Sequence, residues 1–326
     1  SPWRSFAIRP MTTPSPSSDR GPLLNRLLKM APCLLSLLLP LAGEAGQLVT
    51  ATSATPRIAT VDWTIAETLL ALGVTPMAVG DVAPYRAWVG EPQLPAGVID
   101  IGLRAQPNRE LLAELKPDLI LISPLAAPLA PTLSRIAPVH SIALYEPGTD
   151  LWLRLREATL TIAALVNKET EAERQLAALE LDLAQMQAAQ PADLPPLLVV
   201  QFIDERHVRV FGRGSLFEAV MQRLGLRNAW QGETNAWGFS VASLEQFLGM
   251  PEARLVVVDP VPVGVGEKLQ EPGLWQHLPL VQNNPVIHLP ATWSFGGILA
   301  ARRFATLLDG ALREQAVHRA TGGSNQ

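Results

Sequence analysis

After residue 56, the apolar positions of the chain alternate between short continuous runs and stretches with helical spacing. The continuous runs lack polar alternation, so they predict strands of a parallel sheet that is covered on both faces. Strands are expected at residues 57–61, 76–80, 119–123, 139–144, 197–202, 208–211, 254–259 and 286–289. Helices are expected at residues 65–72, 110–115, 216–224, 244–248 and 297–312. This alternation indicates an α/β fold.

A long stretch with helical spacing, residues 150–189, separates the two halves of this pattern. Asn167 interrupts it and is expected to cap a second helix over residues 171–189. At 1.5 Å per residue, that helix is roughly 30 Å long. Prolines follow it at positions 191, 195 and 196.

The second half of the chain repeats the order of the first. One helix ends at Gly73 and its counterpart at Gly225, and glycine commonly follows a helix C-terminus. Capped helices starting at Asn108 and Ser243 each lead into a buried strand. We therefore predict two Rossmann-like lobes with mainly parallel sheets and a single bridging helix, although generic α/β alternation also explains the repeat. The expected divisions are residues 56–166 for the N-terminal lobe, 167–190 for the bridging helix and 195–318 for the C-terminal lobe.

Residues 1–45 differ from the rest of the chain and predict a disordered leader followed by a signal peptide. The apolar run 30–42 follows basic residues, is too short to cross a bilayer, and suits a secretory signal cleaved near Ala45. A helix resting on a membrane is the alternative, but no polar face interrupts the run. We therefore expect export to the periplasm. Cys33, the only cysteine, lies in this run, so the mature chain would have no thiol.

Composition and local motifs argue against several classes of function. The 326 residues carry a formal net charge of −4 and include no basic run, which disfavours a nucleic-acid partner. Residues 264–268 (GVGEK) have the wrong glycine spacing for a phosphate loop, and residues 212–215 (GRGS) do not form a nucleophile elbow. The histidines show no i,i+4 pair of metal ligands. We expect no catalytic residue, no metal site and no intrinsic cofactor.

Three of the eight tryptophans fall in segments where a ligand cleft is expected. Ligands of doubly wound sheets sit beyond the carboxyl ends of the strands. Trp88 lies in a Pro-rich loop, Trp237 follows a polar segment, and Trp293 lies near Phe295 after the last strand. Such residues suit the aromatic wall of a small-molecule site. Packing in the core is the alternative reading, and it is favoured for Trp63, Trp152, Trp230 and Trp275.

Arg104 is the best polar anchor for such a cleft. It follows a strand-like run at residues 98–101, where its side chain would point into the same cleft. Its guanidinium can donate two hydrogen bonds to paired oxygens, such as those of a hydroxamate or a carboxylate. A solvated surface arginine is the alternative.

Several short segments are distinctive enough to suggest a family. They are residues 85–92 (YRAWVGEP), 98–104 (VIDIGLR), 107–108 (PN), 115–117 (LKP), 228–235 (NAWQGETN), 237–238 (WG) and 289–291 (LPA) with Trp293. Together they resemble the periplasmic ferric-hydroxamate-binding proteins of ABC importers, within the superfamily that also binds cobalamin and haem. The resemblance covers residues 57–312. It implies a protein that captures a ferric siderophore of hydroxamate type and delivers it to an inner-membrane permease with its ATPase.

The resemblance also implies roles for individual residues. Arg104 matches the arginine that binds the hydroxamate oxygens, while Trp88, Trp237 and Trp293 match aromatic residues of the cleft. Glu110 and Glu245 match the glutamates, one per lobe, that dock onto permease arginines: each also lies in a first helical turn, where a carboxylate is favoured in any case.

Two positions depart from the family pattern. A ligand-binding tyrosine of the family falls near Ala126, and a second aligned tyrosine falls at Phe295. Both positions stay candidates for ligand contact, but without the hydroxyls Arg104 has fewer helpers, which puts the usual ferrichrome-type preference in doubt. One alternative is haem, cobalamin or another organic chelate on the same scaffold, held by a His or Tyr ligand. The chain disfavours it because it contains only two tyrosines. A periplasmic α/β enzyme is the other alternative. We expect a monomer. We also expect small lobe movement on ligand binding, because a single bridging helix lacks hinge loops.

Overall fold

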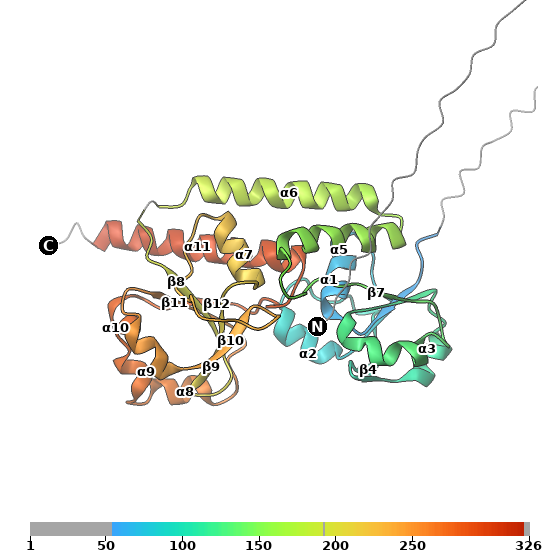
Figure 1. Cartoon of the computed structure of the whole chain (residues 1–326), viewed down its shortest axis with the longest axis horizontal. Helices are drawn as coiled ribbons and strands as arrows, with labels where there is room; N and C mark the ends of the chain where they lie inside the picture. Colours follow the sequence, from blue (N-terminus) through green and yellow to red (C-terminus); the bar gives the residue numbers. More distant parts are fainter. Residues whose placement is uncertain (1–53, 192, 323–326) are drawn as a thin grey trace, which may run out of the picture. The chain divides into compact units, whose positions relative to one another are not determined.

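The computed structural model describes residues 54–191 and 193–322, which form two sheet-containing lobes and the helices that connect them (Figure 1). The predicted leader and signal peptide at residues 1–45, including Cys33, lie outside the described residues. Every helix in the described part of the chain is too short or too polar to span a bilayer. The predicted two-lobed α/β architecture is confirmed.

The N-terminal lobe is built on a five-stranded sheet with the order β3-β2-β1-β6-β7. Its strands are β1 (Ile58–Thr60), β2 (Ala78–Val79), β3 (Ile99–Asp100), β6 (Leu119–Ile122) and β7 (Val139–Ser141), and all neighbours pair in parallel. Around the sheet lie α1 (Trp63–Ala71), α2 (Val82–Val89), α3 (Arg109–Leu115), η1 (Pro124–Leu129), α4 (Ala130–Leu133) and the ribbon of β4 (Gly102–Leu103) with β5 (Gln106–Pro107). Central strands β1 and β6 are buried along their whole length, as expected for a sheet covered on both faces.

The C-terminal lobe has the corresponding order β10-β9-β8-β11-β12. Its strands are β8 (Leu197–Phe202), β9 (His207–Phe211), β10 (Phe239–Ser243), β11 (Arg254–Val258) and β12 (Ile287–Leu289). Only β8, β11 and β12 are parallel; β9 is antiparallel to both β8 and β10, so this sheet is mixed. Its helices are α7 (Leu216–Arg223), η2 (Leu244–Gly249), α8 (Val265–Gln270), α9 (Leu274–His277) and α10 (Pro279–Asn283).

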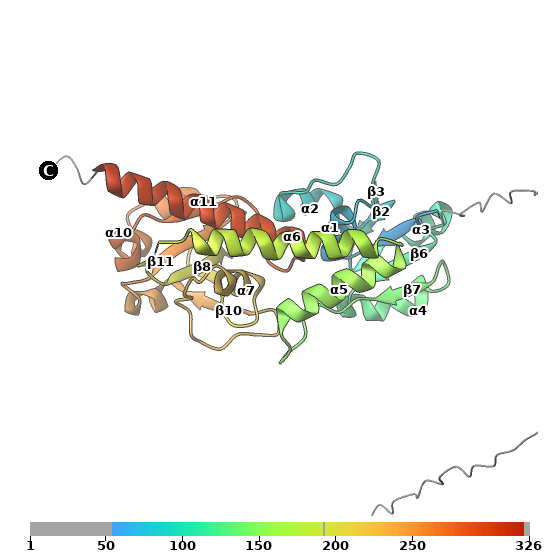
Figure 2. The same cartoon turned by 90° about the horizontal axis from the view of Figure 1, so that it is seen from above.

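Three long helices pack side by side, with α6 in the middle: α5 (Leu151–Leu165), α6 (Glu169–Ala188) and α11 (Ile298–Gly322). Figure 2 shows α6 running along both lobes, with α5 and α11 on either side. The prediction that Asn167 caps the bridging helix was wrong. Lys168 occupies the N-cap without a side-chain bond, and Asn167 instead adopts a left-handed φ of 56° that ends α5.

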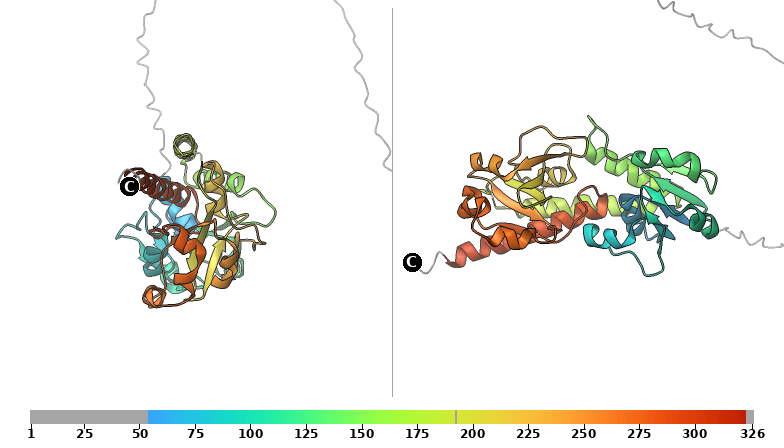
Figure 3. Two further views of the ribbon diagram at one scale, coloured as in Figure 1. Left: turned by 90° about the vertical axis from the view of Figure 1, so that its left-hand side faces the viewer. Right: turned by 90° about the horizontal axis from the view of Figure 1, so that it is seen from below.

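One buried apolar cluster extends through both lobes and the long helices. It includes Leu69 of α1, Leu176 of α6 and Phe304 of α11, which packs on Phe217 of α7 at 4.3 Å between ring centroids. From below, Figure 3 shows the N-terminal end of α11 reaching the N-terminal lobe, where α11 contacts α1. The lobes are therefore joined by a shared core as well as by α6.

Candidate functional site

A cavity of about 490 Å³ lies between the lobes and takes its lining from both. The N-terminal lobe contributes residues that follow strand ends: Asp62 after β1, Ser123 after β6, and Tyr145 after β7. This is the edge at which parallel α/β sheets bind ligands. The C-terminal lobe contributes Arg209 from β9 and Trp293 from the segment after β12.

Arg104 lines this cavity from the N-terminal lobe, and its neighbours fix its direction. Its guanidinium carbon lies 3.8 Å from the centroid of the Trp63 ring, and its Nε lies 3.7 Å from Asp81 Oδ2. The backbone N–H of Arg104 also donates to Asp81, at 3.0 Å. Gly80 permits this packing, because a Cβ there would lie 3.0 Å from Arg104 Cγ. Burial lowers the pKa of Arg104 while Asp62 and Asp81 raise it, and an arginine stays protonated throughout.

Aromatic rings from both lobes line the cavity next to Arg104. Trp293 packs edge-on against Trp63, with centroids 5.0 Å apart, and against Phe295 at 5.3 Å. Phe295 then contacts Trp237 at 5.5 Å, and Trp237 lies 5.6 Å from Tyr145. The first three pairs are edge-to-face and the last is tilted, and ring pairs at these distances are favourable, so the rings form a preorganised wall. Trp237, Trp293, Phe295 and Arg104 are thus brought together in one cavity.

Two residues singled out from the sequence lie outside the cavity lining. Trp88 belongs to α2 rather than to a loop, and its half-buried ring packs against the core, 6.0 Å from the guanidinium carbon of Arg209. Ala126 lies in η1 and packs on the core, while its neighbours Ser123 and Leu125 reach the cavity. Successive side chains of η1 point in different directions, so the position of Ala126 in the sequence does not show which side of the turn it faces.

Tyr145 and Arg209 are among the cavity residues that the sequence reasoning missed. Tyr145 directly follows a predicted strand, so the strand-end rule pointed to it. Arg209 lies between the apolar residues Val208 and Val210, and this alternation indicates that it faces away from the core. Trp63 was assigned to the core, where its ring is buried, but it also supports Arg104.

A buried polar joint connects α1 to the segment that precedes α11. Thr64 Oγ1 donates to the Phe295 carbonyl at 2.6 Å and accepts from the Trp293 indole at 3.0 Å. The Glu67 carboxyl accepts from the Gly297 N–H, and burial raises the pKa of Glu67 to about 8. Tyr145 also donates to the backbone here, at the Gly296 carbonyl, 2.9 Å away. The joint therefore holds the aromatic wall of one lobe against the first helix of the other.

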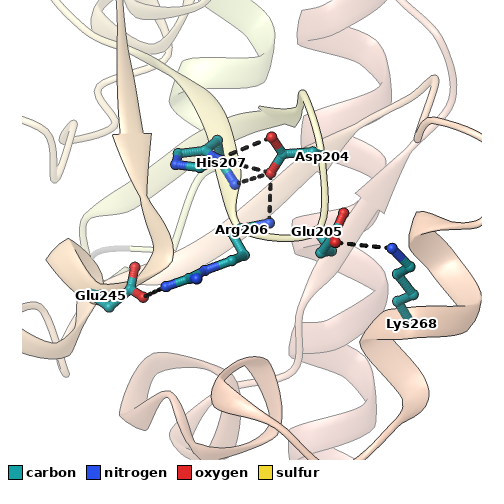
Figure 4. A network of polar contacts seen from close by, with 6 residues as sticks. All are labelled: Asp204, Glu205, Arg206, His207, Glu245 and Lys268. Carbon is teal, nitrogen blue, oxygen red and sulfur yellow. Dashed lines mark hydrogen bonds and ion pairs between the residues drawn. The ribbon is translucent and has the colours of Figure 1, made fainter.

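The two candidate docking glutamates lie on the surface of different lobes. Glu110 is exposed in the first turn of α3, and Glu245 is exposed in the first turn of η2. Figure 4 shows Glu245 paired with Arg206 at 2.7 Å, and this hydrogen bond lowers the pKa of Glu245 to about 2. Arg206 lies in the β8–β9 turn, where Asp204 accepts from the backbone N–H groups of Arg206 and His207 at 2.8 and 2.7 Å.

Metal ligands do not gather anywhere in the described residues: no group of three or more His, Cys, Asp or Glu side chains could hold an ion. The cavity instead combines apolar rings with guanidinium groups. Such a site can bury the carbon framework of a ligand and donate hydrogen bonds to its oxygens.

Comparison with known proteins gives a consistent result. The family described as periplasmic binding protein matches residues 58–292. The iron(3+)-hydroxamate-binding protein FhuD of Escherichia coli (strain K12) is 37% identical over 257 residues, which is 78% of this chain and 86% of that protein. The achromobactin-binding periplasmic protein of Dickeya dadantii (strain 3937) is 29% identical over 75% of this chain and 82% of its own length.

A solved structure extends the likeness to three dimensions. The siderophore-binding protein FhuD of Vibrio cholerae, bound to Fe3+-Desferal, has a TM-score of 0.75 and 28% identity, covering 79% of this chain and 98% of that chain. The family match, the sequence relatives and the two-lobed fold agree with the resemblance noted in the sequence. This chain belongs to the periplasmic binding protein family.

Proposed function

We propose that the chain is a periplasmic substrate-binding protein that captures a ferric siderophore of hydroxamate type and passes it to an ABC permease with its ATPase. The observation that carries this proposal is the single cavity in which Arg104 lies beside Trp237, Trp293 and Phe295. Because metal ligands do not cluster in the described chain, the iron would arrive and stay coordinated by its chelate. The E. coli relative is named for iron(3+)-hydroxamate, and the Vibrio structure holds Fe3+-Desferal.

The geometry gives the aromatic rings and Arg104 different tasks. The indole N–H of Trp63 donates to the Gly80 carbonyl at 2.9 Å, and that of Trp293 donates to Thr64. These two rings therefore act through their apolar surface. Arg104 is oriented by Asp81 and Trp63, so its remaining N–H groups can meet the paired oxygens of a hydroxamate.

The same proposal covers export and transport. A secretory signal within residues 1–45 would deliver the mature chain to the periplasm as a monomer. Glu110 and Glu245, one exposed on each lobe, would dock onto basic residues of the permease. No catalytic role is part of the proposal, because the cavity offers binding groups rather than a paired nucleophile and base.

Titration with four kinds of ligand tests the ligand class. The mature chain is mixed in turn with a ferric hydroxamate, a ferric catecholate, haem and cobalamin while tryptophan fluorescence is followed. Bound ligand should quench the fluorescence, because Trp237 and Trp293 line the cavity. We expect the ferric hydroxamate to saturate this quenching at the lowest concentration of the four ligands. Tighter binding of haem or cobalamin, or turnover of a substrate, would replace this proposal.

Replacing Arg104 tests the anchor. Arg104→Ala should weaken ferric hydroxamate binding by roughly 1.5–3 kcal/mol, the usual contribution of hydrogen bonds to a charged group. Arg213→Ala is the matched control, because Arg213 is an exposed arginine outside this cavity. Calorimetric affinities that are equal for the two variants would remove Arg104 from the site.

A further inference from the structure

Arg209 is a second guanidinium in the cavity, and it comes from the lobe opposite Arg104. It lies in β9 directly across from Gln201 of β8 and Val241 of β10. The adjacent turn is braced by Asp204 and by the Lys268–Glu205 ion pair at 2.9 Å. Strand β9 is therefore held by its neighbours, and the backbone of Arg209 is in place before any ligand binds.

Among the described residues, Arg209 has no carboxylate partner. Its polar contact is a 3.5 Å approach to Gln201 Oε1, which is longer than an ordinary N–H···O bond. Its guanidinium carbon lies 5.6 Å from the Phe239 ring centroid and 6.0 Å from that of Trp88, at the outer limit of a cation–π contact. Half-buried Arg302 differs, because it has Asp182 at 3.2 Å.

The charges facing the cavity leave Arg209 as the cation that is not yet matched. The charged lining residues are Asp62, Arg104 and Arg209. Asp62 accepts from the backbone N–H groups of Thr64 and Ile65 at the start of α1, and Arg104 lies beside Asp81. A neutral ferric chelate bound in the cavity would displace water from the Arg209 guanidinium and would offer it no anionic acceptor in return. Burying a charge without a partner in this way is unfavourable.

We propose that Arg209 binds an acidic group of the siderophore, such as a carboxylate, so that the chain prefers anionic ferric hydroxamates over neutral ones. The inference rests on the proposed function and adds a second anchor to it. Arg104 would hold the hydroxamate oxygens at the iron centre from one lobe. Arg209 would pair with the carboxylate from the other lobe, where its planar fork matches two oxygens.

The test compares two chelates on three proteins. The neutral probe is ferrichrome, a ferric tris-hydroxamate, and the anionic probe is the ferric complex of aerobactin, a citrate-based bis-hydroxamate. We expect wild type to bind the anionic chelate more tightly, and Arg209→Leu to lose roughly 10- to 100-fold for it but little for the neutral one. Arg213→Leu, which removes the same charge outside the cavity, should match wild type for both.

Further measurements separate a ligand contact from a structural role. Arg209→Lys should recover part of the lost affinity for the anionic chelate, and Arg209→Gln should not, with thermal unfolding confirming that each variant is folded. Equal losses for both chelates, or no loss for either, would overturn the role of Arg209 while leaving the proposed function intact. If wild type bound neither chelate, the proposed function would fail and this inference with it.

Discussion

The two lobes have the same strand order but contribute to the cavity by different means. In the five-stranded sheet of the N-terminal lobe every strand is parallel, and cavity residues such as Asp62 and Tyr145 follow the carboxyl ends of its strands. In the C-terminal lobe β9 is antiparallel, and Arg209 projects from the strand itself. The loop before β10 adds Trp237.

This difference has a consequence for specificity. Arg104 lies in the turn between β4 and β5 of the N-terminal lobe, where Asp81 and Trp63 hold its side chain in place. A residue within the β9 strand alternates with core residues, so Arg209 faces the cavity with few polar neighbours. The N-terminal lobe thus holds a preset anchor, whereas the β8–β9 hairpin of the C-terminal lobe is where one substitution can change the ligand preference.

The largest effect is expected where the segment before β10 crosses the start of α7. Gly238 has a φ of 77°, and a Cβ there would lie 2.0 Å from Ser215 N. Gly238→Ala should therefore lower the free energy of unfolding by about 2–4 kcal/mol, from backbone strain and overpacking combined. Urea denaturation measures the loss, and weaker ligand binding should accompany it because Trp237 is adjacent.

Gly102 of the N-terminal lobe is the matched control for that substitution. Its φ of 81° is similar, but nothing lies within 4 Å of a Cβ built there. Gly102→Ala should cost about 1 kcal/mol, from the left-handed conformation alone. If the two variants were equally destabilised, the close approach at Gly238 would not contribute to the stability of the C-terminal lobe.

The joint between the lobes is expected to respond to pH through Glu67. Its ordinary pKa of 4.5 is raised to about 8 in the folded chain, mainly by burial. Folding therefore favours the protonated acid: the stabilisation is complete below the unfolded pKa and is lost as the pH rises through the folded one. Between about pH 6 and pH 8, wild type should therefore lose about 2 kcal/mol of stability relative to Glu67→Gln, which mimics the neutral acid.

Denaturation series at several pH values compare the two proteins. The variant keeps an oxygen that can accept from the Gly297 N–H, so the joint remains connected. Because other titrating groups are common to both proteins, the difference between their curves isolates Glu67. Parallel curves would show that this carboxyl titrates normally and that the joint does not oppose ionisation.

Sequence patterns were sufficient where residues that are close in the sequence decide the local structure. The apolar run of β6, the helix ends at Gly73 and Gly225, and the cap at Asn108 were all predicted, and both glycines have a φ near 70°. These features depend on neighbours in the sequence. The final helix also begins where expected, although α11 continues to Gly322 rather than ending at residue 312.

The remaining features depend on contacts between distant segments. Strand β10 was missed because Phe239 and Ser240 take strand geometry only through pairing with β9. Helix α2 was hidden by Pro84, which the first turn of a helix tolerates. For the candidate site, Arg104 could be singled out from its position after a strand, but its ring support by Trp63 follows from tertiary packing.

The candidate docking residues should also differ between the lobes. Among the described residues Glu110 has no ion pair, whereas Glu245 is held by Arg206. Each of Glu110→Ala and Glu245→Ala should reduce permease-dependent uptake several-fold without changing siderophore affinity, and Glu110→Ala should have the larger effect because Glu245 must first leave its partner. Uptake of the ferric siderophore through the permease is measured with each variant, and the siderophore affinity of each purified variant is measured separately. Unchanged uptake with both variants would place docking elsewhere.

The smallest effect concerns the two repeated capped helices. Asn108 Oδ1 accepts from the Leu111 N–H at 3.0 Å, whereas the Ser243 side chain caps no backbone N–H of η2 within the described chain and interacts with the Glu245 carboxylate instead. Asn108→Ala should therefore cost about 1 kcal/mol of unfolding free energy, and Ser243→Ala should cost much less. A 3₁₀ turn has fewer free N–H groups aligned with its axis, so its stability depends more on buried Leu244 and Phe247 than on a cap. Equal costs would mean that the two copies start in the same way despite their different helical geometry.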